Sequence, residues 1–185
     1  MRIISGIYGR RKLEVPKGRD IRPTSDKIRG AIFNALESHG AIQNARVLDA
    51  FSGTGALGLE ALSRGAAHCT FLDKAKTSLE LTKRNINTLD ACTGSTAILS
   101  DATKHKFVDK TYNLFFLDPP YHKGLIELTL NNILSQHALD KSAILVCESE
   151  REVQPVQSDA FKSLSDKIYG EIRIQILRYN ANTPE

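Results

Sequence analysis

The chain alternates short apolar runs with amphipathic stretches between residues 46 and 149, and this alternation restricts its fold more than any other feature. Apolar runs of strand length stand at 46–51, 68–73, 95–102, 113–118 and 142–149, and helical spacing fills 56–65, 76–89 and 125–139. Strands that alternate with helices form a parallel sheet covered on both faces. Because crossovers between parallel strands are right-handed, a doubly wound, Rossmann-like sheet is the simplest topology. Residues 162–179, bent at Gly170, predict a closing antiparallel hairpin. We therefore expect an α/β fold with a seven-stranded, mostly parallel sheet.

Length and composition fit one domain with a small appendage. The 185 residues are 41% hydrophobic and 25% charged, as in ordinary globular proteins. No apolar run approaches the roughly 20 residues of a membrane helix, and the first residues lack the basic-then-apolar order of a leader. We therefore expect a cytoplasmic protein that does not contact a membrane. The three cysteines are far apart and form no CxxC pair, so we expect no metal site.

Positive charge is concentrated near the N-terminus. Residues 1–36 hold nine Lys or Arg and three acids, whereas the rest of the chain is slightly acidic. Residues 1–15 predict two short strands around Gly6 to Gly9, a hairpin with basic residues on its return limb. This asymmetry favours contact with a polyanion such as nucleic acid over a merely solvated arm. The candidate contact residues are Arg2, Arg10, Arg11 and Lys12.

A helix is expected over residues 24–38, after the loop that follows the hairpin. Thr24 or Ser25 provides the N-cap, because their hydroxyls accept a hydrogen bond from the first turn. Apolar residues recur at helical spacing from residue 28 to residue 36. Lys27 and Arg29 lie off this apolar face in the predicted helix.

A glycine-rich turn follows the first strand of the alternating region, in the sequence VLDAFSGTGALGLEAL. Gly53 and Gly55 let the backbone turn tightly and let a ligand approach, and Gly58 allows a helix to pack closely on the sheet. This pattern alone fits NAD, FAD or S-adenosylmethionine, as well as a turn without a ligand.

Four successive strands end in an aspartate, which sharpens the interpretation. Open α/β sheets bind ligands at the carboxyl ends of their strands, so four acids there should line one crevice. The acid of the second strand stands where a carboxylate accepts the ribose hydroxyls of an adenosine. The four residues are Asp49, Asp73, Asp101 and Asp118.

Asp49 discriminates between the candidate cofactors. A carboxylate beside the glycine turn would repel the pyrophosphate of a dinucleotide. S-adenosylmethionine carries an ammonium and a sulfonium instead, and a carboxylate favours both. The sequence thus favours a methyl donor over a dinucleotide.

Asp118-Pro119-Pro120-Tyr121 ends the fourth strand and suits methylation of an exocyclic amine. Such an amine is a poor nucleophile because its lone pair is delocalised into the ring. The Asp118 carboxylate and the Pro119 carbonyl, which Pro120 holds rigid, would accept hydrogen bonds from the two N–H groups of the amine. These hydrogen bonds would draw the lone pair of the nitrogen out of its delocalisation into the ring. Tyr121 offers a flat face on which an extruded base stacks. With a reference pKa of about 3.9, Asp118 is expected to take the proton only after transfer. The alternative is a plain turn.

The chain resembles the RsmD family of 16S rRNA guanine-N2 methyltransferases over nearly its whole length. The resemblance lies in MRIISGIYGRRKL, RPTSDKIRGAIFNAL, VLDAFSGTGALGLEALSRGA and FLDPPY. It implies a basic N-terminal hairpin and loop over 1–23 that contacts RNA, and a methyltransferase domain over 24–185 opened by a lid helix at 24–38. It also implies a monomer whose substrate is 16S rRNA, naked or within an assembling small ribosomal subunit.

The resemblance also implies which residues hold S-adenosylmethionine. Arg22 to Ser25 would pack over the donor. Family members often carry Glu where Asp73 stands and Ala where Ser52 stands, which affects the detail of the ribose contact. The expected donor-binding residues are Arg22, Thr24, Asp49, Ser52, Gly53, Gly55, Asp73, Lys74, Asp101 and Ala102.

Other functions compete with this one. Adenine N6 in nucleic acid and a protein glutamine amide pose the same electronic problem as guanine N2. A non-enzymatic rRNA-binding assembly factor would have no use for the Asp118 carboxylate, and a dinucleotide-dependent oxidoreductase conflicts with Asp49.

Overall fold

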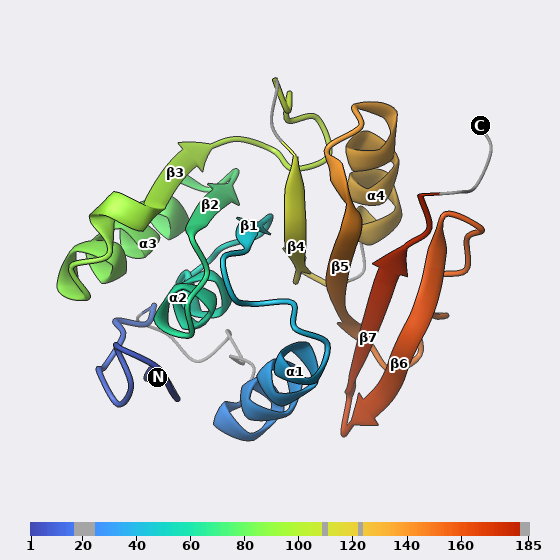
Figure 1. The fold of residues 1–185 in the computed structure, drawn as a ribbon. Helices are drawn as coiled ribbons and strands as arrows, with labels where there is room; N and C mark the ends of the chain where they lie inside the picture. Colours follow the sequence, from blue (N-terminus) through green and yellow to red (C-terminus); the bar gives the residue numbers. More distant parts are fainter. Residues whose placement is uncertain (17–24, 109–110, 122–123, 182–185) are drawn as a thin grey trace.

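The computed structural model describes residues 1–16, 25–108, 111–121 and 124–181. Its helices and strands follow the predicted alternation (Figure 1). The helices are α1 (Asp26–Ser38), α2 (Ala56–Ser63), α3 (Lys76–Thr88) and α4 (Leu125–Ser135), with a 3-10 turn at Cys92–Gly94. The strands are β1 (Arg46–Asp49), β2 (His68–Asp73), β3 (Ser95–Leu99), β4 (Tyr112–Leu117), β5 (Leu139–Glu150), β6 (Phe161–Tyr169) and β7 (Ile172–Tyr179).

The strands form one seven-stranded sheet in the order β3-β2-β1-β4-β5-β7-β6. Strands β1 to β5 run parallel to one another, and β7 runs antiparallel to both of its neighbours, β5 and β6. Gly170, at φ 64°, makes the turn between β6 and β7, as predicted. The predicted α/β fold with a mostly parallel sheet is confirmed. Strand β5 begins at Leu139, earlier than expected, because α4 already ends at Ser135.

Two hydrophobic cores lie on opposite faces of the sheet. Successive residues of a strand point to opposite faces, so Leu114 and Phe116 of β4 enter one core and Phe115 and Leu117 the other. Helices α1, α2 and α3 cover the first face, and α4 covers the second together with residues 100–108 (Figure 1). The β1–β4 border, where the strand order reverses, is where such sheets form a ligand crevice.

The N-terminal segment, residues 1–16, folds back as predicted but forms no extended strands. One antiparallel bridge joins Arg2 and Lys12. Backbone hydrogen bonds on either side of it run from Ile3 N to Arg11 O, at 3.0 Å, and from Leu13 N to Met1 O, at 3.1 Å. Gly6, at φ 82°, approaches the Ser63 carbonyl so closely that a Cβ would lie 1.9 Å from its oxygen.

The N-terminal segment packs on the domain. Ile3 is fully buried in the core that α2 shares. The Glu60 carboxylate, itself buried in α2, accepts hydrogen bonds from Ile4 N at 2.7 Å and Ser5 N at 3.1 Å. Ser63 holds the turn, because its hydroxyl accepts from Tyr8 N at 2.9 Å. Ile3 and Leu13 of the segment therefore belong to the same core as α1 and α2.

Helix α1 begins as predicted, because the Ser25 hydroxyl accepts a hydrogen bond from Ile28 N. Its Ile32, Phe33 and Leu36 are buried against the sheet. Arg29, predicted to lie off the apolar face of this helix, is nevertheless buried, with 1% of the residue exposed. An arginine off the apolar stripe of a helix becomes buried when another segment covers it, and the N-terminal segment does so here. Among the described residues, no helix is long and apolar enough to cross a bilayer.

Candidate active site

A cavity of about 590 Å³ opens at the carboxyl ends of β1 to β5. This volume lies within the range of small-molecule sites. Most of the residues that the sequence predicts for the site line it together. They are Asp49, Ser52, Gly53, Asp73, Lys74, Asp101, Ala102, Asp118, Pro119, Pro120 and Tyr121.

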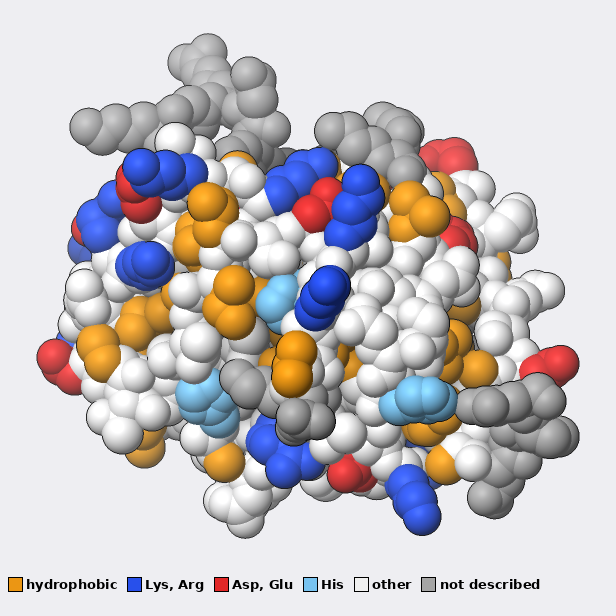
Figure 2. All heavy atoms as spheres, turned by 90° about the horizontal axis from the view of Figure 1, so that it is seen from above, with side chains coloured by type: hydrophobic (Ala, Val, Ile, Leu, Met, Phe, Trp, Pro, Cys, Tyr) orange, Lys and Arg blue, Asp and Glu red, His pale blue; other side chains and the backbone are white. Residues whose placement is uncertain are grey.

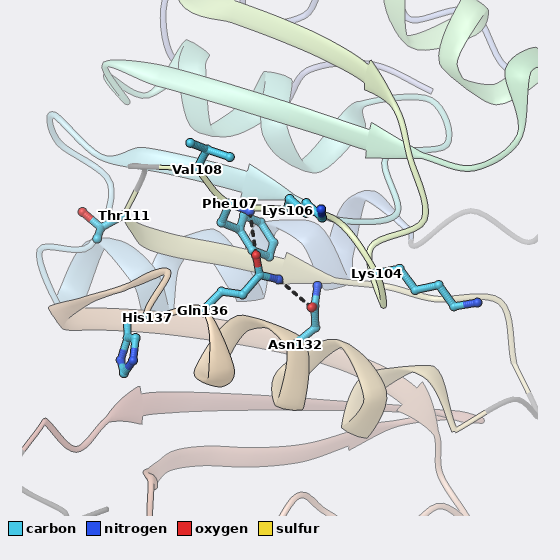
Figure 3. A pocket seen from close by; sticks show the side chains of 8 residues that line it. All are labelled: Lys104, Lys106, Phe107, Val108, Thr111, Asn132, Gln136 and His137. Carbon is cyan, nitrogen blue, oxygen red and sulfur yellow. Dashed lines mark hydrogen bonds between the residues drawn. The ribbon is translucent and has the colours of Figure 1, made fainter.

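A second hollow, of about 730 Å³, lies between α4 and the segment that leads into β4 (Figure 3). Its polar side chains are already engaged: Gln136 accepts from Phe107 N at 3.0 Å and donates to Asn132 Oδ1 at 2.6 Å. Lys104 and Lys106 line it, and none of its lining residues in the described part of the chain is a carboxylate. Although it is the larger hollow, it contains none of the predicted site residues, so we place the chemistry in the cavity at the strand ends.

The glycine turn is held in shape by one acid, Asp73 at the end of β2, and by Thr82 of α3. Asp73 accepts hydrogen bonds from Gly53 N at 3.0 Å and from Ala75 N at 2.8 Å. Thr82 of α3 donates to Gly53 O at 2.9 Å and lies 3.1 Å from the Ser52 hydroxyl. Both carboxylate oxygens of Asp73 therefore already accept a hydrogen bond from a backbone N–H group. Each oxygen has a further lone pair that can accept from a ligand hydroxyl.

Two further glycines shape the start of α2. Gly55 is the N-cap at φ 78°, a left-handed conformation that glycine adopts without strain, and it does not line the cavity. At Gly58, a Cβ would lie 2.4 Å from the Phe71 ring and 2.5 Å from the Cys69 sulfur. The predicted close packing of this helix on the sheet is confirmed.

Asp49 lies at the bottom of the cavity with 2% of its surface exposed. Burial raises the pKa of its carboxyl to about 7, against the opposing effect of a hydrogen bond from Gly58 N at 3.0 Å. The charge of Asp73 raises this pKa further. A cation placed beside Asp49 would stabilise its ionised form.

Asp101 is more open. Its carboxylate accepts from the Thr103 hydroxyl at 2.7 Å and from Thr103 N at 2.9 Å, and these bonds lower the pKa of Asp101. The positive charge of Lys74, which also lines the cavity, adds to this lowering.

Asp118 and Tyr121, from the segment that follows β4, line another wall of the cavity. Asp118 keeps part of its surface open to the cavity, but the surrounding protein removes most water from its carboxyl. Desolvation raises the pKa of Asp118 well above the usual range, and the charges of Glu148 and Asp49 raise it further. Tyr121 is 38% exposed, and its hydroxyl lies 3.5 Å from Glu148 Oε1. Desolvation, followed by the charges of Glu148 and Asp118, raises the pKa of this hydroxyl too.

The sequence analysis missed two charged residues of the cavity, Arg29 and Glu148. The Arg29 Nη2 donates to Arg2 O at 2.6 Å and to Asp26 Oδ1 at 2.8 Å. Its Nε and Nη1 are buried and have no hydrogen-bond partner among the described residues. Glu148, 4% exposed, lies near the carboxyl end of β5, two residues before its last residue, Glu150. The run of acids at 49, 73, 101 and 118 was a signal from which it could have been found.

The residues predicted to bind RNA are all on the N-terminal segment, outside the cavity. Arg2 Nε donates to Asp26 at 3.1 Å. Arg11 donates to the carbonyls of Thr88 and Leu89 at the end of α3, so it has a structural role that the sequence did not indicate. Arg10 and Lys12 are exposed. Arg22 and Thr24, predicted to cover the donor, lie outside the described residues.

Comparisons with known proteins agree with this architecture. The family model described as Conserved hypothetical protein 95 matches residues 1–178. The Ribosomal RNA small subunit methyltransferase D of Escherichia coli (strain K12) is 35% identical over 184 residues, 98% of this chain and 91% of that protein. Its namesake in Buchnera aphidicola is 33% identical over 174 residues, 92% of this chain and 89% of that protein.

Solved structures give the same result. The protein yhhF from Escherichia coli superposes with a TM-score of 0.86 at 34% identity, covering 98% of this chain and 99% of that one. HI0767 from Haemophilus influenzae superposes with a TM-score of 0.81 at 28% identity, covering 97% of this chain and 98% of that one. The resemblance found in the sequence is confirmed, and the fold is the Rossmann-like fold of methyltransferases. This chain belongs to the family of Conserved hypothetical protein 95, the RsmD family.

Proposed function

We propose that this protein transfers a methyl group from S-adenosylmethionine to the exocyclic N2 amine of a guanine in small-subunit (16S) ribosomal RNA. One observation carries the proposal: a single cavity joins the glycine turn and its acids to the Asp118-Pro119-Pro120-Tyr121 wall. The family relatives are named as small-subunit rRNA methyltransferases, which supports the choice of RNA.

The charges of the cavity fit the proposed methyl donor. Asp49 provides a buried carboxylate for a cationic group, and Asp73 and Asp101 provide acceptors for ribose hydroxyls and an amine. The donor also carries a carboxylate, which the many acids of the cavity would repel. Arg29 can bind this carboxylate, because its Nε and Nη1 are buried N–H donors without partners among the described residues. We therefore assign Arg29 to the donor carboxylate.

The wall residues act on the amine. When bound, the donor supplies an electrophilic methyl carbon attached to a sulfonium. Asp118 and the Pro119 carbonyl accept hydrogen bonds from the two N–H groups of the amine. These hydrogen bonds orient the lone pair of the nitrogen toward that carbon. Methyl transfer would leave the nitrogen cationic and the sulfonium as a neutral thioether, and the nitrogen would then lose a proton to the Asp118 carboxylate. Because burial raises the pKa of Asp118, it accepts this proton more readily than an exposed aspartate would.

Tyr121 would hold the target base. Its ring is partly exposed at the cavity, as a surface for stacking must be. A guanine paired in a helix cannot reach the cavity, so the base must be unpaired or extruded. Stacking on an aromatic ring contributes about 1–3 kcal/mol for each base.

The N-terminal segment is proposed to contact RNA phosphates through Arg10 and Lys12. Both side chains are exposed, whereas Arg2 and Arg11 also bind protein groups. Lys and Arg side chains are scattered over the face seen in Figure 2 and do not merge into one patch. Phosphate contacts of this kind position an RNA without reading its sequence.

Nucleoside analysis of ribosomal RNA tests the proposal. Small-subunit rRNA from a strain lacking this gene should lack one N2-methylguanosine, and the purified protein with S-adenosylmethionine should restore it. Restoration on isolated subunits but not on naked rRNA would identify the assembled particle as the substrate. An unchanged nucleoside profile, or loss of N6-methyladenosine instead, would contradict the proposal.

A further inference from the structure

Asp118 and Glu148 are the residues that follow the last pair in the register of the β4–β5 ladder, Leu117 and Cys147. Strands β4 and β5 are parallel, and Leu117 pairs with Cys147. The residues that follow this pair are both acids, Asp118 directly after β4 and Glu148 within β5. Adjacent strands are about 4.8 Å apart, and paired residues point to the same face of a sheet. The register therefore places the two carboxyl groups side by side in the cavity that both line.

The surroundings of Glu148 are those of a positioned acceptor. Only 4% of the residue is exposed, although a glutamate is seldom buried so completely. Its Oε1 lies 3.5 Å from the Tyr121 hydroxyl, next to the ring proposed to stack on the base. Its charge contributes to the raised pKa of Asp118, which is consistent with the proximity that the register gives. Two adjacent acids repel each other, and two N–H donors arriving together would relieve that repulsion.

Guanine brings two such donors on adjacent ring positions. Its N2 amine is next to N1–H, so an acceptor beside the one that binds N2 meets a second N–H. Adenine offers a different pair, because its N6 amine is next to N1, which carries a lone pair and no hydrogen. A carboxylate facing that lone pair would be repelled.

We propose that Glu148 accepts the N1–H of the target guanine and thereby excludes adenine from the site. Asp118 and the Pro119 carbonyl then bind the N2 amine, and Glu148 reads the neighbouring ring position. This inference rests on the proposed function and adds the residue that selects the base. Sites built to hydrogen-bond one substrate group reject analogues that lack it far more strongly than apolar pockets do.

The test uses rRNA in which 2-aminopurine replaces the target guanine, the base that the protein is proposed to methylate. 2-Aminopurine keeps the exocyclic amine, but its N1 has a lone pair and no hydrogen. Wild-type protein should methylate it at least about 100-fold more slowly, in kcat/KM, than guanine. In Glu148→Gln, the amide oxygen can accept from guanine N1–H, and the amide nitrogen can donate to 2-aminopurine N1. We expect this variant to lose about 10-fold or more on guanine and to discriminate less than about 10-fold between the two bases.

Two controls separate base selection from a general defect. Glu150→Gln changes an acid two residues along the same strand that does not line the cavity, and it should keep the wild-type discrimination. S-adenosylhomocysteine affinity and melting temperature show whether Glu148→Gln is folded; if it is not, Glu148→Asp replaces it and should retain discrimination at a reduced rate.

Three outcomes are distinguishable. If Glu148→Gln slows both bases by the same factor, Glu148 does not read N1 and the inference is refuted. The same conclusion follows if wild-type protein methylates guanine and 2-aminopurine equally well. If wild-type protein methylates neither, the proposed function itself fails. 2-Aminopurine also lacks O6, but this affects wild type and Glu148→Gln alike. The change in the guanine to 2-aminopurine ratio of kcat/KM from wild type to variant therefore reports the N1 contact alone.

Discussion

Replacing Arg29 by methionine should weaken binding of the donor's amino-acid portion and leave binding of its adenosine unchanged. Methionine fills a similar volume and removes the charge. Arg29 has two buried N–H groups without a partner among the described residues, and hydrogen bonds to charged groups contribute about 1.5–3 kcal/mol each. Part of this energy offsets desolvation of the ligand carboxylate. We therefore expect a loss of about 2–3 kcal/mol, which corresponds to roughly 30- to 150-fold weaker binding.

Calorimetry with two ligands gives the measurement. S-adenosylhomocysteine carries the carboxylate, whereas 5′-methylthioadenosine lacks the whole amino-acid group. Arg29→Met should bind the first ligand roughly 30- to 150-fold more weakly than wild type and the second equally well. Asp26→Asn is the matched control, because Asp26 pairs with Arg29 at 2.8 Å but does not line the cavity. It should leave both affinities nearly unchanged.

An equal loss for both ligands in Arg29→Met would refute the reasoning. It would mean that Arg29 only shapes the cavity, by holding the N-terminal segment through the Arg2 carbonyl. Unchanged affinity for S-adenosylhomocysteine would place the carboxylate elsewhere.

Three further predictions follow from other residues. Asp118→Ala should lower the methylation rate more than about 100-fold and leave donor affinity intact by calorimetry; a collapse of that affinity would assign Asp118 to the donor. Asp49 has a folded-state pKa of about 7, above its unfolded value of about 3.9, so the protein without ligand should lose stability as pH rises from about 4 through 7. Urea denaturation should show this slope in wild type and a smaller one in Asp49→Asn; equal slopes would contradict it. The double variant Arg10→Ala/Lys12→Ala should reduce the log–log salt slope of RNA binding by about 1–2 without changing the melting temperature, and parallel salt series for variant and wild type would exclude phosphate contact.

The sequence predicted the elements whose signals are local. Strands, helices and the glycine turn depend on the periodicity of apolar residues and on backbone conformations that only glycine adopts readily. Asp49 at the end of β1 and Asp118 just after β4 could be found from the sequence. A residue at the carboxyl end of a parallel strand is expected to line the ligand crevice. The meeting of Asp49, Asp73, Asp101 and Asp118 in one cavity could thus be predicted without coordinates.

What depends on contacts distant in sequence could not be predicted. The burial of Arg29 could not be predicted because it is due to the segment around Arg2, 27 positions away, which covers the start of α1. Arg11 looked like a free cation because nothing in the sequence shows that the end of α3 lies beside it. Glu148 is a different case: the acids at the ends of the other strands could have indicated it, and only its place beside Asp118 depends on the β4–β5 register.

The attachment of the N-terminal segment to α2 and α3 has a consequence for synthesis on the ribosome. Residues 1–13 leave the ribosome long before Glu60, Ser63 and Asn85, the side chains that bind the backbone of the segment. Ile3 therefore stays exposed until α2 has been made, since the contacts beside it span 55–56 residues, and the Glu14–Asn85 contact beside Leu13 spans 71. Met1 and Pro16 line the cavity, so the ligand site is completed only after this late docking. A ribosome-bound chain that ends before α3 should be open to proteases at its N-terminal segment, and a chain that includes α3 should be protected.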